Sequence, residues 1–421
     1  MAADAVDLAL RRARVAVMAA FAIQGLTFAS IVTRLPTFKD KLGLDDTDVL
    51  VILAAVAVMS AVGSLVAGSA AQRWGSAVVL RVVLAGVSVG ALLASFAGTE
   101  AVLVVTTSFY GIFVGAVDAA SNMQGVAVQD RYGRSIMTGF YLTWSAAAVV
   151  GAGYASLTIA LDWSLPVSLG LVMVAGLGLN AATTRSLLHS GPVPEPVMVS
   201  SPEVEPSSVV EPVETTPVHV PWAPVLLLGL PTFAMWLTDS ATSVWSGIYL
   251  EDGLDVSAST APIAFGVYQA VLLVVRMVGD RIVGRFGPAT SIRASGILAT
   301  AALVLIVLAP SLPLVLLGFG LLGGGLALVP PLSFVAAAHI DLRGSQVAVA
   351  RVNVSNYLGY LVAAFAIALV AETVSHRAMF VVPLVFVPLI ALMADQFTPR
   401  QQVSPSPSPP PAPERPATGS L

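Results

Sequence analysis

Long apolar stretches dominate the chain, and the polar residues are gathered into short segments between them. A helix that crosses the hydrocarbon core of a bilayer needs about 20 predominantly apolar residues. Stretches of about this length recur along the chain, and Asp118 and Asp239 are the only charges inside two of them. The pattern predicts an all-α integral membrane protein with twelve transmembrane helices, near residues 15–33, 49–71, 78–98, 101–128, 136–160, 164–183, 223–248, 257–277, 289–309, 313–338, 347–370 and 378–396.

A break in this pattern divides the chain into two halves. Residues 185–221 are rich in Pro, Val, Ser and Glu, which cannot bury a core and favour an extended cytoplasmic linker. The halves, 1–184 and 222–397, echo each other at an offset near 212 residues, since Arg73-Trp74-Gly75 recurs as Arg285-Phe286-Gly287. We therefore expect two pseudo-symmetric six-helix bundles, followed by a disordered cytoplasmic tail at 398–421.

Composition narrows the class of protein further. Hydrophobic residues make up 57% of the chain and charged residues only 10%, against roughly 25% in soluble domains, which excludes an ordinary soluble enzyme. The 20 Lys and Arg face 24 Asp and Glu, so no nucleic-acid partner is expected. With no Cys and only four scattered His, no disulfide, metal site or cofactor is expected either.

The basic residues predict the orientation. Cytoplasmic loops retain Lys and Arg preferentially. With the N-terminus inside, sixteen of the twenty fall on the cytoplasmic side, Arg276 among them, and the other side keeps only Arg34, Lys39, Lys41 and Arg377. The sequence thus predicts a multi-pass protein of the plasma (inner) membrane with both termini in the cytoplasm.

Two acids lie in mid-span, where a charge is costly and indicates a functional site. Asp118 shares a helical face with Asn122, and also with glycines that could instead mark a close helix contact. Asp239 lies in the outer half of its helix and could simply pair with Arg34 or another exterior base. Both acids are candidates for proton coupling, with Asp118 as the first choice.

Polar and aromatic residues form stripes on several helices and predict a substrate cavity between the halves. Structural packing is as good an explanation for any single stripe, but their convergence favours a site. The candidate cavity residues are Gln24, Asn122, Tyr141, Trp144, Trp236, Tyr268, Gln269, Asn353, Asn356 and Tyr357. Glycines and prolines at residues 318–331 supply bending points in the tenth helix, which fit a gate or plain packing equally well.

Several motifs resemble the major facilitator superfamily across nearly the whole chain. The motif between its second and third helices is similar to residues 68–75, with Gly68, Arg73 and Gly75 in place but Gln72 where an acid is usual. Residues 33–40, 118–125, 132–137, 245–250 and 279–281 look like the YbjJ-type branch, next to the fucose permeases. The resemblance implies a cytoplasmic gate at Gly68, Arg73, Gly75, Arg285 and Gly287, and an acid in the cavity on the fourth helix.

The expected function is secondary active transport of a small polar, sugar-like solute by a monomer in the lipid bilayer, with protons as the coupled ion. A proton-linked exporter of a drug or metabolite is the alternative within transport, and a non-transporting membrane sensor is the alternative outside it. An enzyme is not expected, because no nucleophile with its base and no metal set appears.

Overall fold

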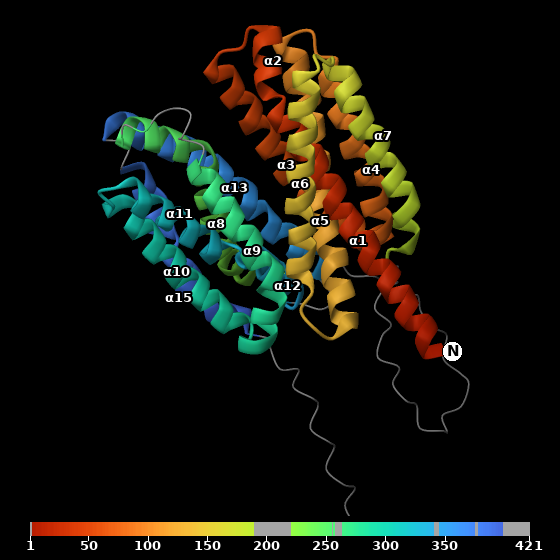
Figure 1. The fold of residues 1–421 in the computed structure, drawn as a ribbon. Helices are drawn as coiled ribbons and strands as arrows, with labels where there is room; N and C mark the ends of the chain where they lie inside the picture. The colour runs from red at the N-terminus through yellow and green to blue at the C-terminus, as the bar shows by residue number, and fades with distance from the viewer. Residues whose placement is uncertain are drawn as a thin grey trace, which may run out of the picture.

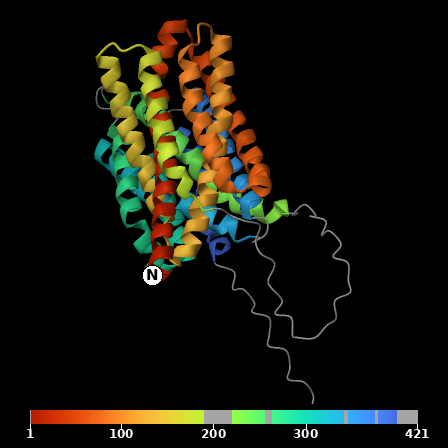
Figure 2. The ribbon, with the colours of Figure 1, turned by 90° about the vertical axis from the view of Figure 1, so that its right-hand side faces the viewer.

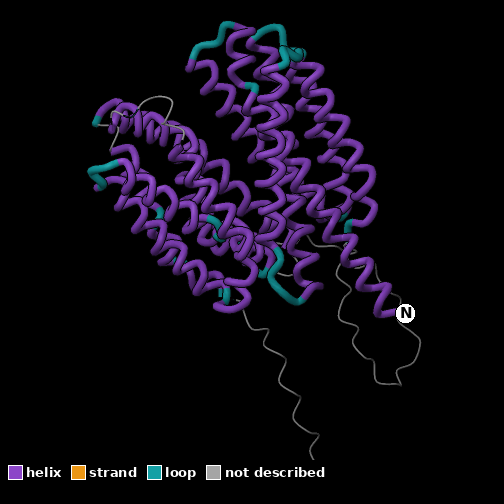
Figure 3. Tube along the Cα trace, in the orientation of Figure 1, coloured by secondary structure: helices purple, strands orange, loops and turns teal. Residues whose placement is uncertain are grey.

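The computed structural model describes residues 2–188, 220–254, 256, 263–340, 345–374 and 378–398. The described part is built from helices joined by short turns, as Figure 3 shows. Most of the predicted linker and nearly all of the predicted tail lie outside the described residues.

The first half forms one bundle. Its elements are α1 (Ala2–Thr33), α2 (Leu35–Leu42), α3 (Asp46–Trp74), α4 (Ser76–Ser95), α5 (Glu100–Tyr132), α6 (Met137–Ala160), α7 (Leu165–Thr183) and the 3₁₀ turn η1 (Thr184–Ser186). Glycines hold α3 and α5 close together, because a Cβ added to Gly115 would lie 1.8 Å from the carbonyl oxygen of Ser60. Small residues of this kind allow the backbones of membrane helices to approach each other.

The second half forms the other bundle. Its elements are α8 (Trp222–Leu254), α9 (Ile263–Phe286), α10 (Pro288–Leu308), α11 (Leu312–Leu326), α12 (Val329–Ala338), α13 (Ser345–Thr373), η2 (Ala378–Phe380), α14 (Val381–Phe386), α15 (Pro388–Leu392) and η3 (Ala394–Phe397). The tenth predicted helix is split into α11 and α12 just before Pro330 and Pro331, which lack the amide hydrogens that would continue the helix.

The described helices confirm the predicted membrane fold. Ten spans are long and apolar enough to cross a bilayer, with α11 and α12 forming one span, Leu312–Ala338. The 29-residue α13 and the shorter apolar segment Ala378–Leu392 occupy the positions predicted for the eleventh and twelfth helices. Large apolar side chains such as Leu308 and Leu392 are exposed on the outside, as expected of a surface that faces lipid.

Two boundaries differ from the sequence prediction in ways that matter for the site. The short helix α2 was not predicted, and it begins at the Leu35-Pro36 step, where proline is favoured in a first helical turn. The predicted end of the eighth helix, near residue 277, is wrong, because α9 continues to Phe286. Arg276 therefore lies well inside a span, and counting it among the cytoplasmic loop residues was an error.

The two bundles lie side by side and diverge at the end of the molecule away from the start of α1 (Figure 1), and Figure 2 shows α1 beginning at the lower end of the molecule. We call the side where α1 begins the terminal face, since the described chain also ends there. The helices α3 and α6 of the first bundle pack against α13 and α9 of the second. Hydrogen bonds join the bundles from the level of Asp118 and Tyr357 down to the terminal face, where Asp280 contacts the start of α6.

Candidate functional site

The carboxyl group of Asp118 lies on α5 at the boundary between the bundles. Gln24 of α1 donates a hydrogen bond to Oδ1 at 2.7 Å, and Tyr357 of α13 donates one to Oδ2 at 2.8 Å. The first bond is internal to the first bundle, whereas the second crosses to the other bundle. Asp118 is thus the predicted mid-span acid and also a direct link between the two halves.

Asn122, one turn along α5, ties this acid to α6. Its amide nitrogen donates to the backbone oxygen of Asp118 at 2.9 Å, and its side-chain oxygen accepts from the Tyr141 hydroxyl at 3.0 Å. The glycine contact considered from the sequence also exists, since Gly111 and Gly115 pack against the α3 backbone. The two features coexist, because the glycines contact α3 while Asp118 contacts α1 and α13.

Asp239 of α8 is buried and bonded to two tyrosines of its own bundle. The hydroxyl of Tyr268 donates to Oδ1 at 2.6 Å, and that of Tyr360 donates to Oδ2 at 3.3 Å. Trp236 lies beside Tyr360, with ring centroids 5.2 Å apart. The alternative pairing of Asp239 with Arg34 is wrong, because the Arg34 guanidinium donates instead to Thr158 at 2.8 Å.

A buried cation, Arg276 of α9, belongs to this site. The sequence analysis did not predict it as a site residue. Its Nη1 donates to the Ser145 hydroxyl of α6 at 2.6 Å, and its guanidinium lies 5.4 Å from the ring centre of Tyr141. Only 5% of the side chain is exposed. Tyr268 lies on the same helical face two turns earlier, and that spacing is the signal that could have placed Arg276 in the cavity.

The helix α13 connects the two acids. Tyr357 and Tyr360, which bind Asp118 and Asp239 respectively, lie three residues apart on it. Asn353 and Asn356, on the same stripe, are hydrogen-bonded to each other at 2.6 Å, and Asn353 also donates to Ser64 of α3 at 3.2 Å. The predicted stripe therefore faces the bundle boundary.

Two predicted cavity residues stand apart from this network. Gln269 is exposed, on the side of α9 away from Tyr268, so it lies outside this network and its place in a cavity stays a prediction. Trp144 is partly buried and packs against Phe28 of α1, with ring centroids 5.9 Å apart, rather than against either acid. We call the network of Gln24, Asp118, Asn122, Tyr141, Ser145, Trp236, Asp239, Tyr268, Arg276, Asn353, Asn356, Tyr357 and Tyr360 the central polar cluster.

The predicted gate motif lies at the terminal face, where it shapes turns. Gly75 and Gly287 have φ of 79° and 80° at equivalent turns of the two halves, a conformation that favours glycine. Arg73 and Arg285 lie over the rings of the aromatic residues that follow them, 5.5 Å from the ring centres. Gly68 packs against α13, because an added Cβ would lie 2.6 Å from the Cβ of Ala350.

The polar contact between the bundles at this face comes instead from Asp280. Its carboxyl group accepts hydrogen bonds at 3.1 Å from the Ser135 hydroxyl and from the amides of Thr138 and Gly139, the first turn of α6. Asp280 is the counterpart of Gly68 at the offset of 212 residues. At these equivalent positions the second half contacts the first through the acid Asp280, whereas the first half contacts the second through close packing at Gly68.

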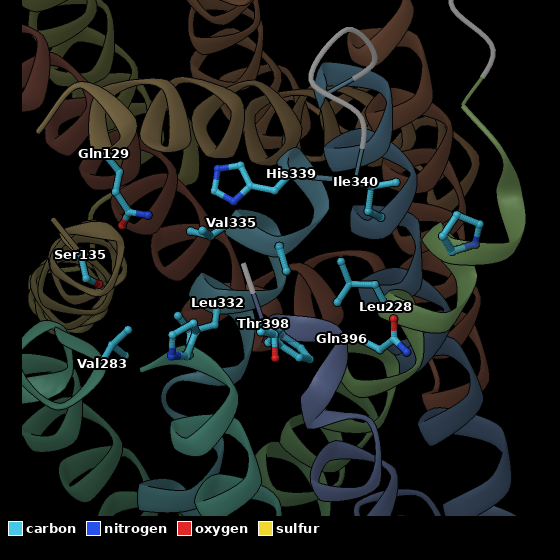
Figure 4. Close-up of a pocket in the computed structure, with 14 residues that line it drawn as sticks. Gln129, Ser135, Leu228, Val283, Leu332, Val335, His339, Ile340, Gln396 and Thr398 are labelled. Atoms are coloured by element: carbon cyan, nitrogen blue, oxygen red, sulfur yellow. The ribbon is translucent and has the colours of Figure 1, made fainter. Parts of the chain in front are cut away.

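A second polar contact lies nearby, between α5 and the end of α12. The Nε2 of His339 lies 3.4 Å from Oδ1 of Asp130. The hydrogen bond to Asp130 raises the pKa of His339 above its ordinary value, and burial opposes this increase. Figure 4 shows His339, Gln129 and Ser135 around a cavity of about 230 Å³ between the bundles, which lies at the terminal face and apart from the central polar cluster.

Comparison with known proteins identifies the family. Residues 17–352 match the Major Facilitator Superfamily. An uncharacterized transporter, y4wD, of Sinorhizobium fredii is 29% identical over 380 residues, which cover 90% of this chain and 96% of that protein. An uncharacterized MFS-type transporter of Yersinia pestis is 25% identical over 363 residues, covering 86% and 89% of the two chains.

Solved structures share the same fold at low sequence identity. The transporter FucP in its outward conformation superposes with a TM-score of 0.72 at 13% identity, covering 91% of this chain and 98% of that one. The human organic anion transporter MFSD10 gives a TM-score of 0.70 at 14% identity, covering 92% and 99%. Twelve predicted spans, two bundles and a family match over most of the length lead to one conclusion. The chain belongs to the major facilitator superfamily and is a membrane transporter rather than an enzyme.

Proposed function

We propose that the protein is a proton-coupled secondary transporter of a small, hydroxyl-bearing solute, working by alternating access between its two bundles. The observation that carries this proposal is the position of Asp118, with one oxygen bonded inside its own bundle and the other bonded across to Tyr357. An acid inside a membrane span is costly, and such residues are typical of proton relays and substrate pathways.

The crossing hydrogen bond links protonation to the arrangement of the bundles. If the bundles tilt about the central polar cluster, Tyr357 moves away from Asp118 and the carboxylate loses one of its two donors. A carboxylate with fewer donors in a poorly hydrated site is stabilised by taking up a proton. Linkage is reciprocal, so protonation of Asp118 must favour the tilted arrangement to the same extent.

The groups around the two acids suit a hydroxylated solute. Tyrosine hydroxyls, asparagine amides and the indole of Trp236 supply donors and acceptors that sugar hydroxyls can match. Solved relatives of the fold include a fucose:proton symporter and a proton:xylose symporter. At 12% and 10% identity these support the proposal only as fold-level analogy.

The orientation and location belong to the same proposal. We place the terminal face in the cytoplasm of a cell with the protein in its plasma membrane, because most of the basic residues fall on that face. The fold places the central polar cluster inside one chain, which supports function as a monomer.

The decisive experiment compares wild-type protein with Asp118→Asn in proteoliposomes that contain a pH-sensitive dye. A thermal-shift panel of neutral sugars, sugar acids, amino acids and drugs at two pH values first selects the solute. For the wild type, adding that solute should drive proton movement and uphill accumulation. Asp118→Asn imitates the neutral acid, so it should still exchange solute across the membrane but lose accumulation driven by a pH gradient.

Asp395→Asn is the matched control, because Asp395 is an exposed acid paired with Arg293 inside the second bundle. This variant should behave as the wild type. Full gradient-driven accumulation by Asp118→Asn would contradict the role of Asp118 and make Asp239 the next candidate. Absence of solute-dependent proton movement with every solute that binds would contradict proton coupling itself.

A further inference from the structure

Arg276 is a buried cation that forms no ion pair with any acid of the described ranges. No carboxylate of the described residues lies within 4.0 Å of its guanidinium, and its only hydrogen bond in the described part of the chain goes to Ser145. The Nε atom is buried and has no hydrogen-bond partner among the residues that the structure describes. Burial of a charged group is costly unless it is paired, so Arg276, which has no ion pair within 4.0 Å among the described residues, favours the approach of an anion.

The two nearby acids do not meet that demand. Both oxygens of Asp118 are occupied by Gln24 and Tyr357. Both oxygens of Asp239 are occupied by Tyr268 and Tyr360. All four donors are neutral, and neither acid forms an ion pair with Arg276 within 4.0 Å, although the opposite charges of Asp239 and Arg276 attract each other through the protein.

The geometry of the side chain favours a planar anion. A guanidinium presents its N–H groups in a rigid fork that matches a carboxylate with two parallel hydrogen bonds. Here Ser145 and the ring of Tyr141 hold one end of the fork in place, while Nε is left over. Held in this way, Arg276 is already oriented before a ligand arrives.

Other atoms of the central polar cluster suit hydroxyl groups. Within the described part of the chain, Oε1 of Gln24 and Oδ1 of Asn356 are buried acceptors without partners, and Nε1 of Trp236 is a buried donor without one. A ligand hydroxyl can donate to an amide oxygen and accept from an indole. A neutral sugar would satisfy these groups but would leave the charge of Arg276 unpaired.

We propose that Arg276 is the anion-binding residue of this site and that the transported solute is a hydroxylated carboxylate of the sugar-acid class. This inference rests on the proposed transport function and adds the charge of the solute to it. The carboxylate of the solute pairs with Arg276, and its hydroxyls bind the amides, the indole and the tyrosines between α1, α8 and α13.

The test is a thermal-shift titration of the purified full chain with D-gluconate and D-glucuronate against D-glucose, at constant ionic strength. The two carboxylates should raise Tm at concentrations where D-glucose has no effect. Arg276→Gln should weaken their binding by about thirtyfold or more, since loss of one partner of a buried charge pair is this costly. Arg276→Lys keeps the charge but loses the fork, and should show an intermediate loss.

Two further variants keep the test independent of folding defects. Arg281→Gln removes an exposed arginine of the same helix and should bind the carboxylates as the wild type does. Ser145→Ala leaves the charge in place and removes only the group that orients it, so it should weaken carboxylate binding by a few fold while retaining it. Each variant is first checked for a single size-exclusion peak and a wild-type Tm without ligand.

The outcomes separate this inference from the transport proposal. Equal stabilisation by D-glucose and the carboxylates, unchanged carboxylate binding by Arg276→Gln, or no stabilisation by either carboxylate would overturn the assignment of Arg276. In each of these cases a neutral solute that drives proton movement in proteoliposomes would leave the transport proposal standing. Binding of the carboxylates without any transport would support the role of Arg276 and contradict the transport proposal.

Discussion

Replacing Asp280 with Ala should shift the protein toward a conformation that is open at the terminal face. The carboxyl group of Asp280 caps the first turn of α6 from the other bundle, through Ser135, Thr138 and Gly139. The residue before that helix, Ile136, provides no side-chain cap of its own. Separation of the bundles at this face must break all three bonds, so their energy favours the closed arrangement.

The size of the effect follows from these contacts. A hydrogen bond to a charged group contributes about 1.5–3 kcal/mol, and a helix cap about 1 kcal/mol. Asp280 is only half-buried, so solvent screening reduces each contribution, and the whole cap is worth roughly 2–3 kcal/mol. Since 1.4 kcal/mol is a factor of ten, Asp280→Ala should change the ratio of the two conformations by about 30- to 150-fold.

Asp280→Asn provides a graded comparison. The asparagine oxygen can still accept from an amide of α6, but the side chain loses its charge and one acceptor oxygen. We expect its shift to lie between those of the wild type and Asp280→Ala. The counterpart position, Gly68, carries no such group, so the effect should come from this half alone.

The assay is a distance measurement between two spin labels on the face opposite the terminal face. The chain contains no Cys, so Ser164→Cys and Ser311→Cys introduce the only two labels. These residues precede α7 in the first bundle and α11 in the second. Asp280→Ala should move the distance distribution toward shorter values, because the opposite face closes as the terminal face opens.

Two results would refute the reasoning. An Asp280→Ala distribution that matches the wild type would mean that the cap contributes nothing to the conformational equilibrium. An equal shift in Asp395→Asn, which removes the exposed Arg293–Asp395 ion pair within one bundle, would assign the effect to surface charge instead.

Three further predictions concern pH, packing and topology. Because Asp130 raises the pKa of His339 above 6.5, their ion pair should favour closure of the terminal face below about pH 6.5 and lose this effect as pH rises through the raised pKa. The same labels should show that His339→Gln abolishes this pH dependence, and an unchanged pH profile would contradict it. Gly115→Ala should lower Tm, because overpacking against Ser60 costs roughly 1–3 kcal/mol of folding stability. Gly153→Ala is the control and should leave Tm unchanged, because open space surrounds Gly153. Equal Tm values for the two variants would contradict the close packing at Gly115. A reporter fused after residue 200 should lie in the cytoplasm and one in the 37–47 loop outside it, and the reverse result would overturn the orientation.

The sequence alone determined the class of protein and the number of spans. Long apolar stretches have one stable solution in a bilayer, because each backbone group must be hydrogen-bonded within its own helix. This constraint depends only on the hydropathy of neighbouring residues. Most helix ends were therefore predicted closely. It also singled out Asp118 and Asp239, because a charge inside an apolar stretch is visible without any knowledge of the fold.

Only the tertiary structure decided which side chains meet. Asp118 and Tyr357 are far apart in the sequence and come within 2.8 Å only because α5 and α13 pack across the bundle boundary. Arg276 was predicted to lie in a loop, because a charged residue in a hydropathy pattern usually indicates the end of a span. Its burial depends on the packing of α6 against α9, which hydropathy does not show. Asp280 caps a helix of the other bundle, and no local pattern encodes a partner from another part of the chain. Helix formation depends on near neighbours, but the pairing of polar groups depends on packing between distant segments, and that packing builds the candidate site.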